Sequence, residues 1–193
     1  MFDALVLSTV VIFVAELGDK SQLMAMTFAS RYRARDVLIG ITLATAVVHL
    51  ASVGIGYWVG EAFGEYQAWI SIAAGVAFAG FALWTLRGDH LSEDEAQKAT
   101  AATGRAILAV GLAFFLAELG DKTMLATITL AVDHDWFGTW IGSTLGMVAA
   151  DALAIAVGAL LGQQLPEKII RYGAAAAFAV FAVVLVVEGV SML

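Results

Sequence analysis

Six long apolar stretches occupy almost the whole of this 193-residue chain. A helix needs roughly 20 predominantly apolar residues to cross the hydrocarbon core of a bilayer. The stretches that meet this requirement cover residues 4–29, 37–59, 67–86, 106–131, 137–161 and 169–190. Hydrophobic residues make up 61% of the chain and charged residues 14%, whereas a soluble domain is about half apolar and about a quarter charged. The sequence therefore predicts an all-α integral membrane protein with six transmembrane helices.

Little of the chain is left outside these stretches apart from one polar segment at 87–104. Because no soluble domain remains to carry a separate activity, we expect the function to reside in the membrane-embedded part. The N-terminus lacks the basic region and the small-residue cleavage site of a signal peptide, so the first stretch is expected to be retained. The chain contains no cysteine, which excludes disulfides, thiolate metal ligands and cysteine nucleophiles.

Apart from Lys20 and Lys122, the lysine and arginine residues fall on one side of the predicted membrane. They lie in or beside the first, third and fifth connections: Arg31, Arg33, Arg35, Arg87, Lys98, Arg105, Lys168 and Arg171. The opposite face has no lysine or arginine, and its acids are Asp3, Glu61, Glu65, Asp133 and Asp135. Basic connections tend to stay in the cytoplasm. Both termini are therefore predicted to lie outside the cytoplasm.

A short charged motif interrupts the first and the fourth apolar stretch. Residues 15–20 and 117–122 both read AELGDK, and Ser21 after the first copy corresponds to Thr123 after the second. An offset of 102 residues relates the two copies. Since each half holds three predicted spans, the second half must enter the membrane from the opposite side.

The sequence thus predicts two inverted three-helix repeats, residues 1–86 and 105–193, joined by a cytoplasmic loop at 87–104. Inverted repeats are a recurring plan of secondary transporters, which bind their substrate near the midplane at interrupted helices from each half.

Four acidic residues lie in the middle of predicted spans: Glu16, Asp19, Glu118 and Asp121. In a continuous helix the glutamate and the aspartate of one copy share a face, because they are three residues apart. An ionised side chain at the bilayer centre costs at least ~2.5–3.5 kcal/mol. The four carboxylates are therefore expected to face the interior and to converge between the halves. Gly18 and Gly120 allow a bend in the helix or the close approach of a ligand.

An oxygen-rich site of this kind favours hard divalent cations such as Mn²⁺, Ca²⁺ and Mg²⁺ over zinc or copper. Ser21, Thr123 and Gln22 are expected to supplement the carboxylates or to hold them in place. A thioether ligand from Met124 would favour Mn²⁺ over Ca²⁺, but methionine is also ordinary filler in an apolar helix. When the cation leaves, the crowded carboxylates repel one another, so cation release favours proton uptake. Returning protons would then drive export of the cation.

Two hypotheses are open for the motif lysines. Lys20 follows Glu16 by four residues and Lys122 follows Glu118 likewise, which is the favourable order for an ion pair along one helix. Each lysine either neutralises its own helix, or balances the charge of the empty site and moves away when the metal arrives.

His49 and Asp151 occupy equivalent places in the second and fifth predicted spans, 102 residues apart. Titratable groups at this depth are candidates for a proton relay. They could equally be interior polar groups that are satisfied by neighbouring side chains.

The doubled motif resembles the signature E-x-G-D-K-[ST] of the family that contains transmembrane protein 165. Residues 16–21 (ELGDKS) and 118–123 (ELGDKT) match it without departure, and the similarity in architecture covers essentially the whole chain. The family includes Golgi proteins of eukaryotes, chloroplast proteins and small bacterial manganese exporters. The resemblance implies transport of Mn²⁺ or Ca²⁺ as the substrate, by proton exchange, with the motif carboxylates as ligands. It also implies a compact bacterial member in the inner (plasma) membrane.

Other functions are compatible with parts of the pattern. An exporter of a cationic amino acid would also use carboxylates, but it needs a pocket for the rest of the substrate. A passive cation channel would lack proton coupling. An intramembrane aspartyl protease would carry G-x-G-D, whereas both copies here read E-L-G-D-K. A scaffold protein gives no reason to bury four acids. No enzymatic activity and no cofactor are expected. The expected partners are the cation, protons and membrane lipid but no nucleic acid, and a homo-oligomer is compatible with the sequence.

Overall fold

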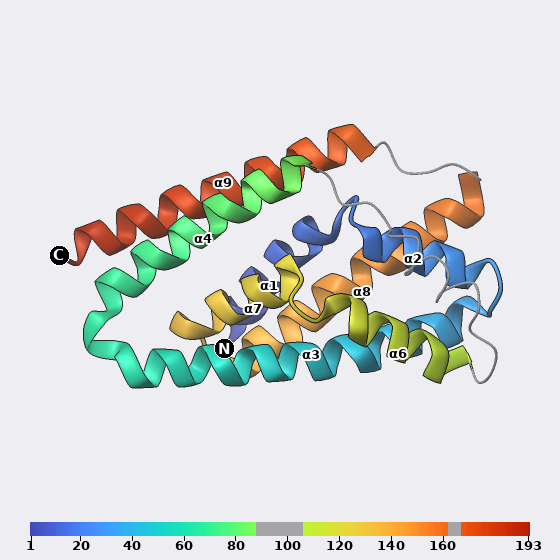
Figure 1. Ribbon diagram of the computed structural model, residues 1–193, viewed down its shortest axis with the longest axis horizontal. Coiled ribbons are helices and arrows are strands. Elements are labelled where there is room, and N and C mark those ends of the chain that lie inside the picture. Colours follow the sequence, from blue (N-terminus) through green and yellow to red (C-terminus); the bar gives the residue numbers. More distant parts are fainter. Residues whose placement is uncertain (88–105, 162–166) are drawn as a thin grey trace.

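The computed structural model describes residues 1–87, 106–161 and 167–193, and these residues form helices and short connections (Figure 1). The helices are α1 (Phe2–Glu16), α2 (Lys20–Ala29), α3 (Ala34–Phe63), α4 (Gln67–Arg87), α6 (Ala106–Glu118), α7 (Lys122–Asp133), α8 (Trp136–Leu161) and α9 (Glu167–Ser191). A 3-10 turn, η1 (Gly64–Tyr66), lies between α3 and α4. The all-α prediction is confirmed. Residues 88–105 lie outside the described residues. They include all of the predicted loop 87–104 except Arg87, and therefore Lys98, as well as Arg105.

Within the described ranges, three segments are long and apolar enough to cross a membrane: Ala34–Arg87, Trp136–Ala159 and Arg171–Ser191. The first of them contains both α3 and α4, and the chain reverses its direction at η1 between these two helices (Figure 1). The helix α6 is apolar but shorter. These segments agree with the membrane class that the composition predicts.

The predicted stretches 4–29 and 106–131 are each divided into two helices, α1 and α2 in the first half and α6 and α7 in the second. The break falls at a glycine in both copies, with φ of 77° at Gly18 and 79° at Gly120. Only glycine adopts this left-handed conformation without steric strain. The expectation that glutamate and aspartate share one face of a continuous helix is therefore wrong, because the chain turns between them.

An aspartate begins the second helix of each pair. Asp19 is the N-cap of α2, and its side chain accepts a hydrogen bond of 2.7 Å from the backbone N–H of Lys20. Asp121 occupies the same position before α7, in an extended conformation. Aspartate is a favoured N-cap, and its charge suits the positive end of the helix dipole. The order G-D-K is thus a helix-start signal that the expectation of one continuous helix overlooked.

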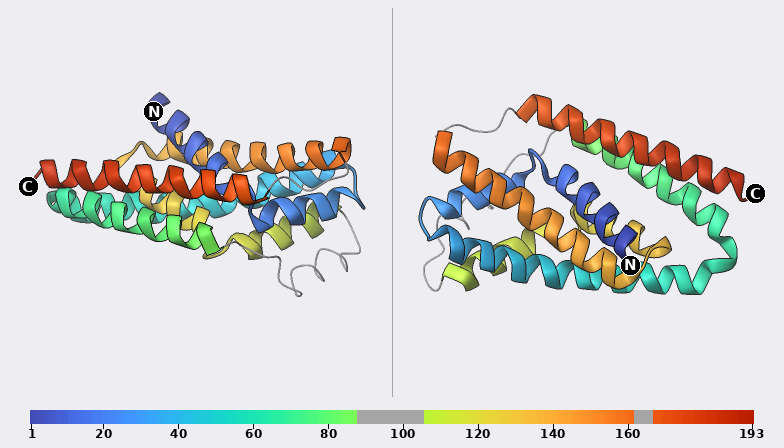
Figure 2. Two further views of the ribbon diagram at one scale, coloured as in Figure 1. Left: turned by 90° about the horizontal axis from the view of Figure 1, so that it is seen from above. Right: turned by 180° about the vertical axis from the view of Figure 1, so that it is seen from behind.

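Helices of one half pack mainly against helices of the other. The long helix α3 contacts α6 and α7, while α8 contacts α1 and α2. The remaining two helices, α4 and α9, lie side by side in every view (Figures 1 and 2). Phe78 and Phe81 of α4 pack against Phe178 of α9, with ring centroids 5.8 Å and 5.9 Å apart. The space around the two helix breaks is therefore built from both halves.

Close contacts between the halves occur as pairs that the offset of 102 residues relates. A Cβ atom on Gly40 would collide with the carbonyl oxygen of Ile107, and one on Gly142 would collide with the carbonyl oxygen of Leu5. Adding 102 converts Gly40 into Gly142 and Leu5 into Ile107. The same helix-to-helix contact is thus made twice, once from each half.

Candidate metal centre

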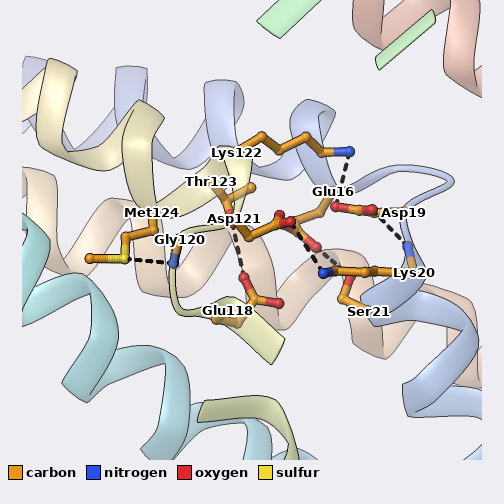
Figure 3. Close-up of polar contacts among 10 residues, drawn as sticks. All are labelled: Glu16, Asp19, Lys20, Ser21, Glu118, Gly120, Asp121, Lys122, Thr123 and Met124. Carbon is orange, nitrogen blue, oxygen red and sulfur yellow. Dashed lines mark hydrogen bonds and ion pairs between the residues drawn. The ribbon is translucent and has the colours of Figure 1, made fainter. Parts of the chain in front are cut away.

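The two helix breaks bring carboxylates of both motif copies together (Figure 3). Glu16 ends α1, and Asp19 and Asp121 begin α2 and α7; one carboxylate oxygen from each lies within 4.8 Å of the others. All three side chains are buried. Glu118, at the end of α6, is also buried but lies outside this group of three. The structure thus assembles three of the four predicted ligands, and we call Glu16, Asp19 and Asp121 the carboxylate cluster.

The hydroxyl groups that follow each motif hold the glutamates. Ser21 Oγ donates a short hydrogen bond to Glu16 Oε2, and Thr123 Oγ1 donates one of 3.0 Å to Glu118 Oε2. The other oxygen of Glu16, Oε1, is buried and has no hydrogen-bond partner among the described residues. A buried carboxylate oxygen without a partner is costly unless a proton or an ion satisfies it. The hydroxyls therefore orient the glutamates and leave an oxygen of Glu16 available to a ligand.

Each motif lysine lies beside the aspartate of the other copy. Lys122 Nζ is 3.0 Å from Asp19 Oδ2, and Lys20 Nζ is 3.4 Å from Asp121 Oδ1. The break between glutamate and lysine removes the i to i+4 geometry of a continuous helix. These two ion pairs join the halves, which favours the hypothesis that the lysines balance the charge of the shared site.

The residue three places after each aspartate caps the broken backbone. The Gly18 N–H donates to Gln22 Oε1 at 2.8 Å, and the Gly120 N–H donates to Met124 Sδ at 3.2 Å. Gln22 Nε2 also donates to the carbonyl oxygen of Ala150 in α8, at 2.7 Å. Figure 3 shows the Met124 side chain directed away from the carboxylate cluster. Gln22 and Met124 thus support the backbone, and the structure does not bring the Met124 sulfur to the carboxylates.

His49 in α3 and Asp151 in α8 have no exposed surface. Neither ring nitrogen of His49 and neither carboxylate oxygen of Asp151 has a hydrogen-bond partner among the described residues. The alternative that these two residues are polar groups satisfied by neighbouring side chains therefore finds no support in the described part of the chain.

A second group of polar residues lies at the end of α7. Tyr57, Glu61, Gln67, Asp133 and His134 line part of a cavity of about 260 Å³. Burial raises the pKa of the Asp133 carboxyl, His134 opposes this change, and the negative charge of Glu188 adds to it. The Asp133 side chain is exposed, so solvent weakens each of these effects.

The family model described as "Divalent cation/proton antiporter GDT1" matches residues 4–93 and 106–193 of this chain. A protein from Vibrio cholerae serotype O1 named "Putative manganese exporter" is 32% identical over 190 residues, which cover 94% of this chain and 90% of the relative. The "GDT1-like protein sll0615" of Synechocystis sp. is 31% identical, over 95% of this chain and 97% of its own length. "Protein PAM71, chloroplastic" of Arabidopsis thaliana is 34% identical, over 92% of this chain and 55% of its own length. No solved structure matches this chain.

Proposed function

This chain belongs to the divalent cation/proton antiporter family GDT1, and on that premise we propose that it exports Mn²⁺ from the cytoplasm in exchange for protons. Its resemblance to the family of transmembrane protein 165 is confirmed by the same matches. The observation that carries the proposal is the carboxylate cluster, in which residues of both halves meet within 4.8 Å. Burial of acidic side chains at membrane depth costs free energy, and such residues commonly line ion or proton pathways.

The chemistry of the cluster suits a compact divalent ion. Carboxylate and hydroxyl oxygens are the ligands that Mn²⁺, Ca²⁺ and Mg²⁺ prefer. Ca²⁺ takes about six to eight oxygen ligands, and the cluster would need water to supply that number. The Vibrio cholerae relative carries manganese in its name. Mn²⁺ is therefore the first candidate substrate, with Ca²⁺ second.

The charges of the two motifs suggest how cation and protons exchange. Four ionised carboxylates and two lysine ammonium groups leave two uncompensated negative charges in the two motifs. One divalent cation or two protons would neutralise them. Because a change in net charge is costly at membrane depth, the cation-loaded and the proton-loaded states are expected to carry the same charge. The proposed exchange is accordingly one divalent cation for two protons, without net movement of charge.

The lysines have a defined part in this exchange. Lys122 and Lys20 approach the two aspartates that would ligate the cation, at 3.0 Å and 3.4 Å. A cation on these aspartates would repel both ammonium groups. We expect the lysines to balance the empty site and to move away when the cation binds.

For the whole chain, the proposed architecture is six transmembrane segments in two inverted three-helix repeats. The repeats would be residues 1–86 and 105–193, with α1–α2 and α6–α7 as interrupted spans and residues 87–104 as a cytoplasmic loop. Two findings support this arrangement: the close contacts that the 102-residue offset relates, and helix breaks at equivalent glycines. Interrupted helices at the midplane are the usual substrate site of inverted-repeat transporters, which expose it alternately to each side. Both termini would lie outside the cytoplasm, in the plasma membrane of a bacterium.

The test is metal movement in proteoliposomes that contain the full-length chain. Mn²⁺ and Ca²⁺ are measured separately, with and without an imposed proton gradient. We expect saturable Mn²⁺ movement that follows the proton gradient and does not respond to a membrane potential alone.

Asp121→Asn should abolish this movement while the protein still inserts. Thr123→Ser is the matched control, because it gives the second motif the residue of the first, and it should retain transport. Mn²⁺ movement that ignores the proton gradient would indicate a channel and contradict the proposal. Movement of neither ion would contradict it as well.

A further inference from the structure

A fifth carboxylate lies near the cluster and has no part in the motif. Asp151 has no exposed surface, and neither of its oxygens has a hydrogen-bond partner among the described residues. Burial of an unpaired carboxylate is strongly unfavourable in a protein interior. A group of this kind requires an explanation, and an absent ion is one of the few available.

Asp151 lies outside the carboxylate cluster but close enough to the motif glutamates to feel their charge. It interacts electrostatically with Glu16 and with Glu118, which belong to different copies of the motif. The residue before it, Ala150, accepts the hydrogen bond of 2.7 Å from Gln22 Nε2. This bond fixes the backbone of α8 against α2, directly beside the first motif. The helix α8 thus carries a buried carboxylate next to the backbone that contacts the first motif.

The equivalent position in the first half carries a different side chain. Thr45 Oγ1 lies 3.2 Å from Met147 Sδ, and this contact marks where α3 and α8 meet. His49 and Asp151 each follow it by four residues, about 6 Å along a helix. Because α3 and α8 run in opposite directions (Figure 1), His49 and Asp151 lie on opposite sides of the contact. At this pair of equivalent positions, the two halves therefore differ: Asp151 carries a carboxylate, and His49 on the other side of the contact does not.

We infer that Asp151 is an additional cation ligand. Together with Glu16 it holds the ion on one side of the contact between α3 and α8, the side on which the C-terminal part of α8 lies. This inference rests on the proposed function. In the proposed topology that side faces the cytoplasm, so a carboxylate strengthens binding where export loads the ion. His49 offers no carboxylate on the outer side, and release there is easier. The sequence difference between the halves would thus set the direction in which the ion is bound and released.

The experiment is equilibrium binding of Mn²⁺ to the purified full-length chain in detergent, at one fixed pH. Asp151→Asn should weaken the affinity about tenfold or more, and Asp151→Glu should retain most of it. His49→Asn is the matched control at the equivalent position, and it should leave the affinity nearly unchanged. His49→Asp adds a carboxylate there and should tighten binding.

A second readout separates ligation from a structural role. Addition of Mn²⁺ should raise the Tm of the wild-type chain, and this increase should shrink in Asp151→Asn. A structural role would instead change the Tm of the ion-free protein and leave the increase intact. If Asp151→Asn does not yield folded protein, Asp151→Ser is measured in the same way.

The outcomes distinguish this inference from the proposed function. If Asp151→Asn binds Mn²⁺ with the affinity of the wild type, Asp151 is not a ligand, and the proposed function is unaffected. If His49→Asp leaves the affinity unchanged, the proposed asymmetry between the halves is wrong. Failure of the wild-type chain to bind either Mn²⁺ or Ca²⁺ would overturn both.

Discussion

The two motif copies share their sequence from glutamate to lysine and their backbone at the glycine, but the structure holds them differently. In the first copy, the Gln22 side chain accepts from the Gly18 N–H and donates to the Ala150 carbonyl of α8. In the second copy, the Gly120 N–H has the Met124 sulfur as its acceptor, and sulfur is a weak one. The first break is therefore anchored to a neighbouring helix, and the second is held by a local contact.

Burial differs between the copies as well. The side chain of Lys122 is 3% exposed and that of Lys20 is 19% exposed. Gly120 is exposed, whereas Gly18 is half-buried. Both motifs thus contribute an aspartate to the carboxylate cluster, but the backbone at the break is more exposed in the second copy than in the first. We expect the second break to move when the cation binds and leaves, while the first break keeps its place.

The largest expected difference between the copies concerns the lysines. Removal of one partner from a buried ion pair costs about 3–5 kcal/mol, whereas an exposed pair contributes about 0–1 kcal/mol. Neither pair is fully exposed, but Lys122 is the more deeply buried of the two lysines, so Lys122→Met should lower the Tm more than Lys20→Met. The check is thermal unfolding of both variants in the same detergent. Equal effects would show that the difference in burial has no energetic consequence.

An exchange of the two capping residues should give the next largest effect. Gln22→Met leaves the Gly18 N–H with a poorer acceptor and the Ala150 carbonyl without its donor, at a cost of about 1–3 kcal/mol. Met124→Gln should stabilise the fold slightly and slow transport, since it tightens the break that we expect to move. Thermal unfolding and Mn²⁺ flux are measured together. Faster or unchanged flux in Met124→Gln would contradict a mobile second break.

Replacement of the glycine at the second break should have a moderate effect. A Cβ on Gly120 meets no atom within 4 Å, but φ there is 79°. Gly120→Ala should therefore cost only the conformational strain, about 1–2 kcal/mol. Gly120→Asn should cost less, because asparagine tolerates the left-handed region better. A Tm for Gly120→Ala equal to that of the wild type would mean that the break relaxes readily.

The smallest effect is expected at the end of α7. The raised pKa of Asp133 means that its ionised form is less favourable in the folded protein than in the unfolded chain. This destabilisation is absent below the unfolded pKa and complete above the folded one. Asp133→Asn should thus raise the Tm slightly at neutral pH and leave it unchanged in acid. The equivalent position in the first half is Arg31, and Arg31→Gln should lack this pH dependence.

Much of the helical fold follows from local sequence. The apolar stretches predict the helices to within a few residues at most ends, because length and hydropathy decide them. The repeated motif also predicts that Glu16, Asp19 and Asp121 meet, since buried acids must converge.

The partners of the motif lysines could not be predicted from the sequence without knowledge of the helix breaks. The ion pairs of Lys20 and Lys122 cross between copies because the glycines end the helices, and the assumption of a continuous helix gave the wrong partners. The separation of Glu118 from the cluster depends on tertiary packing, which no local pattern encodes. The signals for the breaks were present in the order glycine, aspartate, lysine, as a left-handed residue followed by a helix N-cap.

The central claim is that both motif copies form a single cation site. The most direct test is the number of Mn²⁺ ions bound per chain at saturation, measured by equilibrium dialysis for the wild type, Asp19→Asn and Asp121→Asn. The account predicts one ion for the wild type and essentially none for either variant at the same Mn²⁺ concentration, because each aspartate contributes to the same cluster. Two ions for the wild type and one for each variant would show two independent sites and would contradict the claim.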